Sequence, residues 1–424
     1  MAYQANQRAG AAARALLRPL RASPALRGAW APFWLSRTAI VWVAVFAAIA
    51  LGPGQGGLAA ENAAKFDEPA LTQAFGGALS PLARWDAVWY LRIADSGYGG
   101  SQTKAAFFPL YPLLVRGGGE LLGGSHGARL LAAYLISLAA FLAALVLLWR
   151  LVSLELGSPL ARPTLLLLAV FPAALYFGAP YSESLFLLAS VGAFYAARTG
   201  RFGWAGGALF AAAATRSTGL LLLIPLALLW WAQGPARRRP GQLAWLALGP
   251  LAVGLYALYL GLSHGDALAF LDVQGAWYRH FAGPLGGVWD GLVAGVEGAR
   301  QLLSGSREPV YFRQAGGDPF RVASVNLMLL ASLAFALVAW VGVWRRLPPA
   351  YGAWITAALL VPLSFPVGPQ PLMSLPRFLA VLFPIFMWLA IVCEERRLTE
   401  RAVAVSALLL GLFTASFASW HWVS

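Results

Sequence analysis

The sequence predicts an all-α integral membrane protein with many membrane-spanning helices, and three observations lead to this fold class. First, 59% of the 424 residues are hydrophobic and only 11% are charged, whereas a soluble domain carries about 25% charged residues. Second, several apolar runs approach or exceed the roughly 20 residues that a helix needs to cross a bilayer. Third, arginines gather in short clusters between these runs, which is typical of cytoplasmic loops in membrane proteins.

Residues 1–32 form a basic segment that we expect to lie in the cytoplasm. A signal peptide would share the positive charge, but the following apolar run, Phe33 to Leu51, is long and lacks a clear small-x-small cleavage site. We therefore predict a retained first helix with its N-terminus in the cytoplasm. This helix opens a single transmembrane domain over residues 33–420.

A long segment, residues 53–127, follows the first apolar run and is predicted to lie outside the cytoplasm. Its acidic and basic residues are mixed, so it lacks the positive charge of a cytoplasmic loop. Loops of this length are uncommon in compact proteins and tend to be functional. The apolar pattern of residues 85–93 predicts an amphipathic helix along the membrane interface, and residues 107–115, interrupted by two prolines, predict a second interfacial piece.

Ten further apolar runs bring the predicted total to about eleven spans. They cover residues 128–149, 162–178, 183–198, 203–214, 217–232, 241–262, 322–344, 351–367, 375–392 and 401–420. If the helices alternate in direction, every cytoplasmic connection contains a basic cluster, whereas the long outer loops 53–127 and 263–321 are mixed in charge. Residues 203–214 are short for a span, so the 203–232 region could instead be a broken or tilted hairpin.

Several kinds of site are disfavoured by the remaining composition. The net charge of +14 is explained by the loop clusters, with binding of anionic lipid head groups as a further contribution. Nucleic acid is not expected, because no basic stripe with interleaved aromatic residues lies outside the helices. The single cysteine, Cys393, cannot form an intrachain disulfide and is interpreted as a small buried hydrophobe. The four histidines show no metal-ligand spacing, so no metal and no other cofactor is expected.

Polar residues gather in five groups that the predicted topology places on the outer face. They are Arg84-Trp85-Asp86 with Arg92, Tyr181-Ser182-Glu183-Ser184, Thr215-Arg216-Ser217, Pro376-Arg377-Phe378, and the set Gln274, Trp277 and Arg279. An acidic residue beside a membrane is expensive unless it is solvated, paired or functional. Asp86 is therefore the first candidate for chemistry.

Each group also has a purely structural interpretation. Ser182 and Glu183 could cap a helix and complement its dipole. Arg216 and Arg377 could extend to the lipid head groups, and Asp86 could be a solvated charge on an amphipathic helix. Taken together, two acids and several arginines on one membrane face resemble an anion-binding pocket with a base beside it.

Four segments are similar to the PIG-V-type mannosyltransferases, which belong to the GT-C class of polytopic glycosyltransferases. These segments are Arg84-Trp85-Asp86 through Ala106-Phe107-Phe108-Pro109-Leu110-Tyr111-Pro112-Leu113, Tyr176 to Phe186, Ala214 to Gly219, and Pro376-Arg377-Phe378. Similar residues recur from about residue 36 to about residue 390. The combination of the WD loop, FFPxYP and YSES is specific, whereas each motif alone is weak. The short, Arg-rich and Lys-poor chain looks like a prokaryotic member.

The resemblance implies a GT-C-like bundle that performs an inverting glycosyl transfer on the extracytoplasmic face of the plasma membrane. Such enzymes use a lipid-linked sugar donor and a catalytic acidic residue in the first outer loop, a position that Asp86 matches. The PIG-V group uses dolichyl-phosphate mannose. For this chain we expect a polyprenyl-phosphate hexose, with mannose first and another sugar as the alternative, and a lipid or glycan acceptor.

The chemistry of the residues agrees with this interpretation. A carboxylate within hydrogen-bond reach of an acceptor hydroxyl can act as general base, and Asp86 is assigned that role. Fixed arginines can stabilise the charge of the leaving polyprenyl phosphate without a metal. The candidates for this second role are Arg216, Arg377, Arg279 and Arg92. The candidates for contact with the sugar or the isoprenoid are Trp85, Trp89, Tyr90, Tyr181, Glu183, Gln274 and Trp277.

Two other classes of function are weighed against transfer. A polytopic lipid or solute transporter would favour acidic residues in mid-helix, but here the acids lie outside the apolar runs, and the hydropathy shows no convincing inverted repeat. A membrane scaffold without catalysis would not need Asp86, Glu183, Arg216 and Arg377 to meet. The meeting of these four residues is therefore what separates an enzyme from a scaffold.

Overall fold

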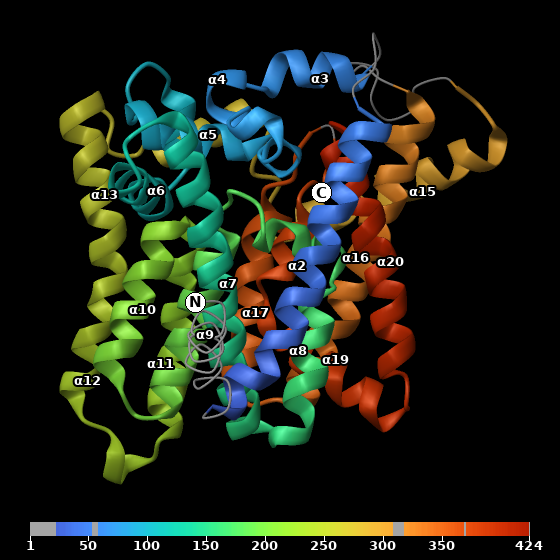
Figure 1. Ribbon diagram of the computed structural model, residues 1–424. Coiled ribbons are helices and arrows are strands. Elements are labelled where there is room, and N and C mark those ends of the chain that lie inside the picture. Colours follow the sequence, from blue (N-terminus) through green and yellow to red (C-terminus); the bar gives the residue numbers. More distant parts are fainter. Residues whose placement is uncertain (1–22, 53–57, 308–317, 369, 424) are drawn as a thin grey trace, which may run out of the picture.

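The computed structural model describes residues 23–52, 58–307, 318–368 and 370–423, and these residues form a helical bundle (Figure 1). The regular elements are α-helices and short 3-10 helices, and within the described ranges the only β pairing is an isolated bridge between Arg279 and Val367. Five helices are long and apolar enough to cross a membrane, which confirms the predicted all-α, multi-pass membrane class. They are α2 (Pro24–Ala50), α7 (His126–Glu155), the helical stretch Pro240–His264, α16 (Pro319–Arg346) and α20 (Thr399–Ala418).

The other six predicted spans form shorter or divided helices. α9 (Glu183–Arg198), α10 (Phe202–Thr215) and α17 (Pro349–Ser364) are each continuous. Three runs are divided: α8 (Ala161–Ala169) is followed by η5 (Pro172–Phe177), η6 (Ser217–Leu222) by α11 (Leu223–Ala232), and α18 (Leu375–Ala380) by α19 (Phe383–Glu395). Pro172 and Pro384 stand at two of these breaks, since proline cannot donate the helical hydrogen bond. The total of eleven spans remains a prediction.

The first helix begins earlier than the sequence pattern indicated. α2 starts at Pro24, and the hydroxyl of Ser23 caps it by accepting a hydrogen bond from the Leu26 amide at 3.3 Å. The predicted boundary between residues 32 and 33 therefore lies inside a helix, because it was placed at the start of the apolar run and not at the cap. Residues 1–22 of the predicted basic segment lie outside the described residues.

The first outer loop folds into a group of short helices at one end of the bundle, the upper end in Figure 1, which we call the loop end. The group contains α3 (Leu58–Phe66), α4 (Pro69–Thr72), η1 (Phe75–Gly77), η2 (Ser80–Leu82), α5 (Asp86–Ser96), η3 (Gln102–Ala106) and α6 (Leu110–Leu121). Both predicted interfacial helices are thus present, as α5 and α6. Pro109 stands at the N-cap of α6, so it begins this helix and does not interrupt it.

The second outer loop is also largely helical. It contains α14 (Ala269–Asp272), η9 (Val273–Trp277) and α15 (Gly286–Ser304), and α15 packs against α16 through glycines. A Cβ at Gly298 would lie 2.7 Å from the carbonyl oxygen of Ala323, so only glycine permits this approach. The remaining short elements are η4 (Ser158–Leu160), η7 (Pro235–Arg237), α12 (Pro240–Ala244), η8 (Trp245–Ala247) and α13 (Leu248–His264).

A buried arginine supports the segment that leads into the site. Arg37 of α2 is 4% exposed, and its guanidinium donates to the carbonyl oxygens of Ala174 at 2.9 Å and Ala169 at 3.3 Å. These carbonyls are available because the helix breaks between α8 and η5. The guanidinium also lies over the Phe141 ring at 4.6 Å. Arg37 thus fixes the chain just before the Tyr181–Ser184 turn at the start of α9.

Candidate functional site

A cavity of about 1150 Å³ lies at the loop end of the bundle. Its walls come from α3, α5, η6, η9, the beginning of α16, the end of α17 and α18. Its size is comparable with that of pockets that hold small-molecule ligands, which are about 300–1,000 Å³. Nine of the twelve predicted site residues line it, namely Asp86, Arg216, Arg279, Arg377, Trp85, Trp89, Tyr90, Gln274 and Trp277.

An ionic network runs from the cavity into the protein core. Arg377 donates to Asp86 through Nη1 and to Glu183 through Nε, and Arg216 Nη1 lies 2.6 Å from the same Glu183 oxygen. The side chain of Asp86 is 20% exposed, whereas those of Arg377 and Glu183 are 6% and 0% exposed. Asp86 is therefore the acid of this network that a ligand in the cavity can reach. Glu183 is the fixed counter-charge beneath it.

A third cation, Arg279, approaches from the second outer loop. Its Nη1 donates to the carbonyl oxygen of Phe365 at 3.0 Å, and its guanidinium lies 5.7 Å from the ring centre of Phe378. Arg216 lies over the same ring at 5.6 Å. Burial, followed by the positive charges of Arg377 and Arg216, lowers the pKa of Arg279 to about 10, while Asp86 opposes this shift. Arg279 therefore keeps its proton at neutral pH.

The formal charge of the site favours an anion. Five cations line the cavity, namely Lys65, Arg216, Arg279, Arg321 and Arg377. They face the lining carboxylates of Asp86, Asp272 and Asp318 and the buried carboxylate of Glu183 beneath them, so the formal sum is +1. Guanidinium groups match the oxygens of phosphate in geometry as well as in charge. The arrangement is thus suited to a ligand that carries a phosphate, with the Asp86 carboxylate beside it.

Backbone strain concentrates next to the charged residues of the cavity. Trp85, Tyr278 and Ser374 have φ angles of 59°, 57° and 71°, in a region that residues other than glycine rarely occupy. Each strained residue precedes a cavity charge by one to three positions: Trp85 precedes Asp86, Tyr278 precedes Arg279, and Ser374 precedes Arg377. Such conformations persist where the surroundings impose them, commonly at functional sites.

Aromatic residues from both outer loops form one wall of the cavity. The rings of Trp89 and Phe107 are stacked at 5.9 Å, and Trp277 meets both edge-on, at 5.9 and 6.0 Å. Gln274 lines the cavity beside them, and its side-chain amide donates to the carbonyl oxygen of Phe270 at 3.1 Å. The wall joins the two outer loops, which the sequence could only place on the same side of the membrane.

Tyr90 connects the cavity to the Tyr181–Ser184 turn. Its hydroxyl lies 2.7 Å from the Ser182 hydroxyl. Burial, followed by the negative charge of Glu183, raises the pKa of Tyr90 to about 12. Tyr90 is thus a neutral hydrogen-bonding group at physiological pH and not a base.

Two residues predicted to contact substrate, Tyr181 and Glu183, lie behind the cavity. Both are fully buried, and neither belongs to the lining. The Tyr181 hydroxyl donates to the carbonyl oxygen of Arg84 at 2.9 Å, so it supports the strained turn before Asp86. The first turn of α9 thus faces the core, and direct substrate contact by these two residues stays a prediction.

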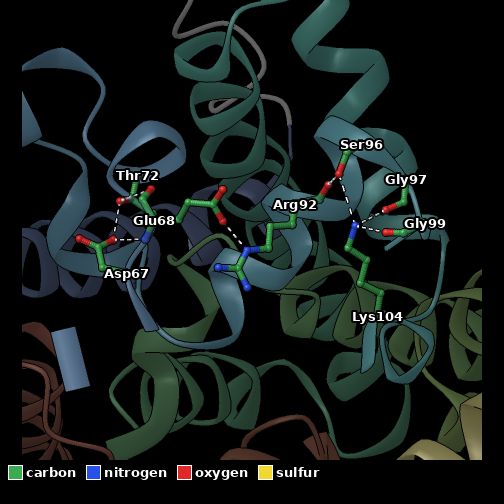
Figure 2. A network of polar contacts seen from close by, with 8 residues as sticks. All are labelled: Asp67, Glu68, Thr72, Arg92, Ser96, Gly97, Gly99 and Lys104. Carbon is green, nitrogen blue, oxygen red and sulfur yellow. Dashed lines mark hydrogen bonds and ion pairs between the residues drawn. The ribbon is translucent and has the colours of Figure 1, made fainter. Parts of the chain in front are cut away.

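Arg92 does not belong to the phosphate-facing set either. Its guanidinium pairs with Glu68 and lies over the Trp89 ring at 5.0 Å, outside the cavity lining (Figure 2). The reason is helical geometry, since six residues after Asp86 the side chain has turned about 240° around α5. Arg92 contacts the back of the aromatic wall and not the cavity.

Sequence reasoning missed many lining residues with polar or aromatic side chains. Three of them are Lys65 of α3, Arg321 in the first turn of α16, and Trp422, which follows α20. The carboxylates of Asp272 and Asp318 also belong to the lining. Arg321 and Trp422 stand at the outer ends of the predicted spans 322–344 and 401–420. Their position at the same membrane face as Asp86 was the available signal, although no motif marked them.

The first half of the chain matches a known protein family. Residues 33–227 match the family model described as mannosyltransferase (PIG-V). The chain is 39% identical over 155 residues to GPI alpha-1,6-mannosyltransferase 2 of Mus musculus, which is 35% of this chain and 31% of that protein. For the enzymes of Rattus norvegicus and Homo sapiens, the identities are 41% over 152 residues and 38% over 153 residues. The chain thus matches about a third of the length of these curated relatives.

Among solved structures, an oligosaccharyltransferase from Archaeoglobus fulgidus overlaps with this chain at a TM-score of 0.44 and 11% identity, over 92% of this chain and 56% of that one. A second structure shows an archaeal oligosaccharyltransferase from the same organism in complex with an inhibitory peptide and a dolichol-phosphate. It overlaps with this chain at a TM-score of 0.40 and 13% identity, over 79% of this chain and 52% of that one. Asp86, Glu183 and Arg216 all fall within the matched residues 33–227. Over these residues the predicted resemblance is confirmed, because they match the PIG-V mannosyltransferase family model and the curated relatives above.

Proposed function

We propose that this protein is an inverting glycosyltransferase that moves a hexose, mannose in the first place, from a polyprenyl-phosphate donor to a lipid or glycan acceptor. The observation that carries the proposal is the meeting of the Asp86 carboxylate, which is bonded to Arg377, with Arg216 and Arg279 in a single cavity. These four residues come from segments far apart in the chain. The similarity to PIG-V mannosyltransferases supports the choice of sugar and of a lipid-linked donor.

Asp86 is proposed as the general base. The acceptor hydroxyl attacks the anomeric carbon, its proton passes to the Asp86 carboxylate, and the bond from the anomeric carbon to the phosphate oxygen breaks. The electron pair of that bond leaves with the polyprenyl phosphate. A base positioned in this way contributes about 10²- to 10⁴-fold to the rate.

The arginines are proposed to hold the phosphate and to stabilise the charge that grows on it as it leaves. Positive groups fixed before the reaction are effective because they need no reorganisation in the transition state. In the unliganded site Arg377 is engaged by Asp86 and Glu183. A bound phosphate would compete with Asp86 for the Arg377 guanidinium, which would free the carboxylate to accept a proton.

The helix ends support an extracytoplasmic site at the plasma membrane. Arg321 lines the cavity at one end of α16, and the basic pair Arg345 and Arg346 stands in the last turn at the other end. The helix has 28 residues and is about 42 Å long at 1.5 Å per residue, enough to cross a bilayer. The positive-inside rule assigns the basic end to the cytoplasm, so the cavity would face outward.

The test is transfer of radiolabelled mannose from polyprenyl-phosphate mannose to a membrane lipid extract by the purified protein. Asp86→Asn should lower turnover at least about 100-fold. Asp95→Asn is the matched control, because Asp95 lies on the same helix and pairs with Arg129 at 2.7 Å outside the cavity lining. Near-normal turnover of Asp86→Asn would remove the base assignment. Movement of the donor across the membrane without a new glycosidic bond would indicate a transporter instead.

A further inference from the structure

One corner of the cavity is built from aromatic rings beside Asp86. Phe66 of α3, Trp85 and Trp422 all line the cavity, and we call these three residues the aromatic corner. The Trp85 ring lies 5.2 Å from the Phe66 ring and 5.3 Å from the Trp422 ring. Trp85 is adjacent to Asp86 in the chain, so the corner directly flanks the proposed base.

The segment that carries Trp422 is fixed in place by its neighbours. The side-chain amide of Asn62 donates to the carbonyl oxygen of Trp420 at 3.1 Å, and the Arg84 guanidinium lies 4.6 Å from the Trp420 ring centre. Trp420 itself has a φ of 62°, which turns the chain after α20. Trp420 is buried outside the cavity lining, whereas Trp422 belongs to the lining.

The corner holds two hydrogen-bond donors that have no partner among the described residues. They are the indole Nε1 atoms of Trp85, which is 8% exposed, and Trp422. Buried polar groups are nearly always hydrogen-bonded, so an unpaired one needs an explanation. Two further unpaired indole donors, those of Trp277 and Trp354, belong to residues that line the same cavity. These Nε1 atoms are buried from the cavity in this structure, so a ligand would accept from them only after a shift of the rings.

The corner and the three arginines offer two kinds of surface in one cavity, and the corner has a cation of its own beside it, since the Lys65 ammonium lies 5.2 Å from the Phe66 ring centre. The Arg216 guanidinium contacts the rings of Phe186 and Phe378. The Arg279 guanidinium also contacts the Phe378 ring, so the two arginines share it. Asp86 bonds to Arg377 on the cationic side and follows Trp85 on the aromatic side. Indole rings offer an apolar face together with an N–H donor, which suits a sugar ring with its C–H face and hydroxyl oxygens. The cationic side suits a phosphate.

We propose that the aromatic corner is the acceptor subsite and takes the neutral sugar or polyol head group of the acceptor, with one hydroxyl against Asp86. This inference rests on the proposed function, and it assigns the two substrates to opposite sides of one carboxylate. Trp422 lies outside residues 33–227, the part of the chain that matches the family model. The corner therefore adds a specificity-determining residue from the C-terminal end of the chain.

The experiment measures dissociation constants for four probes, with the full chain in lipid nanodiscs. Octyl mannoside and octyl glucoside present a sugar, octyl tetraethylene glycol ether presents the same chain without a sugar, and farnesyl phosphate probes the cationic side. The variants are Trp422→Leu, which removes the ring, and Trp422→Phe, which keeps an aromatic face. Trp420→Phe is the matched control, since Trp420 contacts the same Trp85 ring, at 5.6 Å, outside the lining.

We expect the wild-type protein to bind at least one octyl glycoside more tightly than the ether. Trp422→Leu should weaken that binding about tenfold, the upper range for one aromatic contact, and Trp422→Phe should restore part of it. Farnesyl phosphate affinity should stay within about twofold in both variants, and Trp420→Phe should change neither affinity. A melting temperature for each variant separates binding loss from unfolding.

Three results would overturn the subsite: equal binding of glycosides and ether by the wild-type protein, unchanged glycoside binding in folded Trp422→Leu, or an equal loss of farnesyl phosphate affinity in that variant. Failure of the proposed function has a different signature. In that case the wild-type protein would not bind farnesyl phosphate, or Asp86→Asn would retain transfer, whatever residue stands at position 422.

Discussion

At the scale of single residues, the charged network of the site depends on a carboxylate that lies outside the cavity lining. Glu183 is fully buried and neutralises both Arg377 and Arg216. Breaking a buried pair by removing one partner costs about 3–5 kcal/mol, because the remaining charge is left uncompensated. Glu183→Gln should therefore lower the melting temperature and also weaken farnesyl phosphate binding, since the two guanidinium groups lose the anchor that orients them.

Glu155→Gln is the matched control for this prediction. Glu155 is also buried, at 4% side-chain exposure, and pairs with Arg198 and with the Tyr351 hydroxyl at 3.0 Å, outside the cavity lining. It should destabilise the protein without changing farnesyl phosphate affinity. If Glu183→Gln behaved in the same way, Glu183 would have only a structural role.

Arg279 gives the site a pH dependence of defined sign. Its pKa is lowered to about 10 by burial and by the neighbouring guanidinium groups, so it is protonated below that pH and neutral above it. Farnesyl phosphate affinity should be constant near pH 8 and fall as the pH rises through about 10. In Arg279→Gln the affinity should be lower at pH 8, and the decrease near pH 10 should be absent. A decrease that persists in the variant would assign the titration to another group.

How far the sequence could predict the site follows from where each residue lies on its helix. Asp86, Arg216 and Arg377 were predictable because a charged side chain at the end of an apolar run is energetically costly unless it is solvated, paired or functional. The burial of Glu183 and the outward turn of Arg92 were not, since the pattern of a short helix does not reveal which face meets the core. Lys65 carries no local signal, and only the folded chain brings it to the cavity, whereas Trp422 was marked only by its place after an apolar run at the same membrane face as Asp86.

At the scale of elements, α5 and η3 are joined by a loop that a buried lysine holds together. Lys104 donates to the carbonyl oxygens of Gly97 at 2.9 Å and Gly99 at 2.8 Å, and to the Ser96 hydroxyl at 3.3 Å (Figure 2). Gly97 has a φ of 73°, which directs its carbonyl within this turn. The loop stands directly before Phe107, a member of the aromatic wall of the cavity.

Lys104→Met should destabilise the protein by about 1–3 kcal/mol, because it removes the donor of three partly buried hydrogen bonds while keeping the length of the side chain. Thermal unfolding with a tryptophan fluorescence readout measures the change. Lys65→Met, which removes an exposed lysine from α3, serves as the stability control. An unchanged melting temperature in Lys104→Met would show that the loop is held by other contacts.

The apolar runs of the sequence predict where the membrane spans lie. Several runs form divided helices, so the number of spans cannot be read from the runs. The apolar run 375–392 forms α18 and α19, with Arg377 in the first of the two pieces. A hydropathy pattern registers a continuous apolar stretch, but α18 ends at Ala380 and α19 begins at Phe383, next to Pro384, which cannot donate a helical hydrogen bond. Arg377 lies in α18, before this break, and donates to Asp86 from within an apolar segment.

At the scale of the whole molecule, the proposed function requires that the loop end faces outward. One arginine at each end of the bundle provides a matched test of this orientation. Arg116 on α6 lies at the loop end, and Arg237 belongs to the basic segment between α11 and α12, at the lower end in Figure 1; both are exposed. In a Cys393→Ala background, Arg116→Cys should react with a membrane-impermeant maleimide in intact cells. Arg237→Cys should react only after permeabilisation, because the basic clusters mark the cytoplasmic side. The reverse pattern would place Asp86 and the three arginines in the cytoplasm, where a donor presented on the outer face could not reach them.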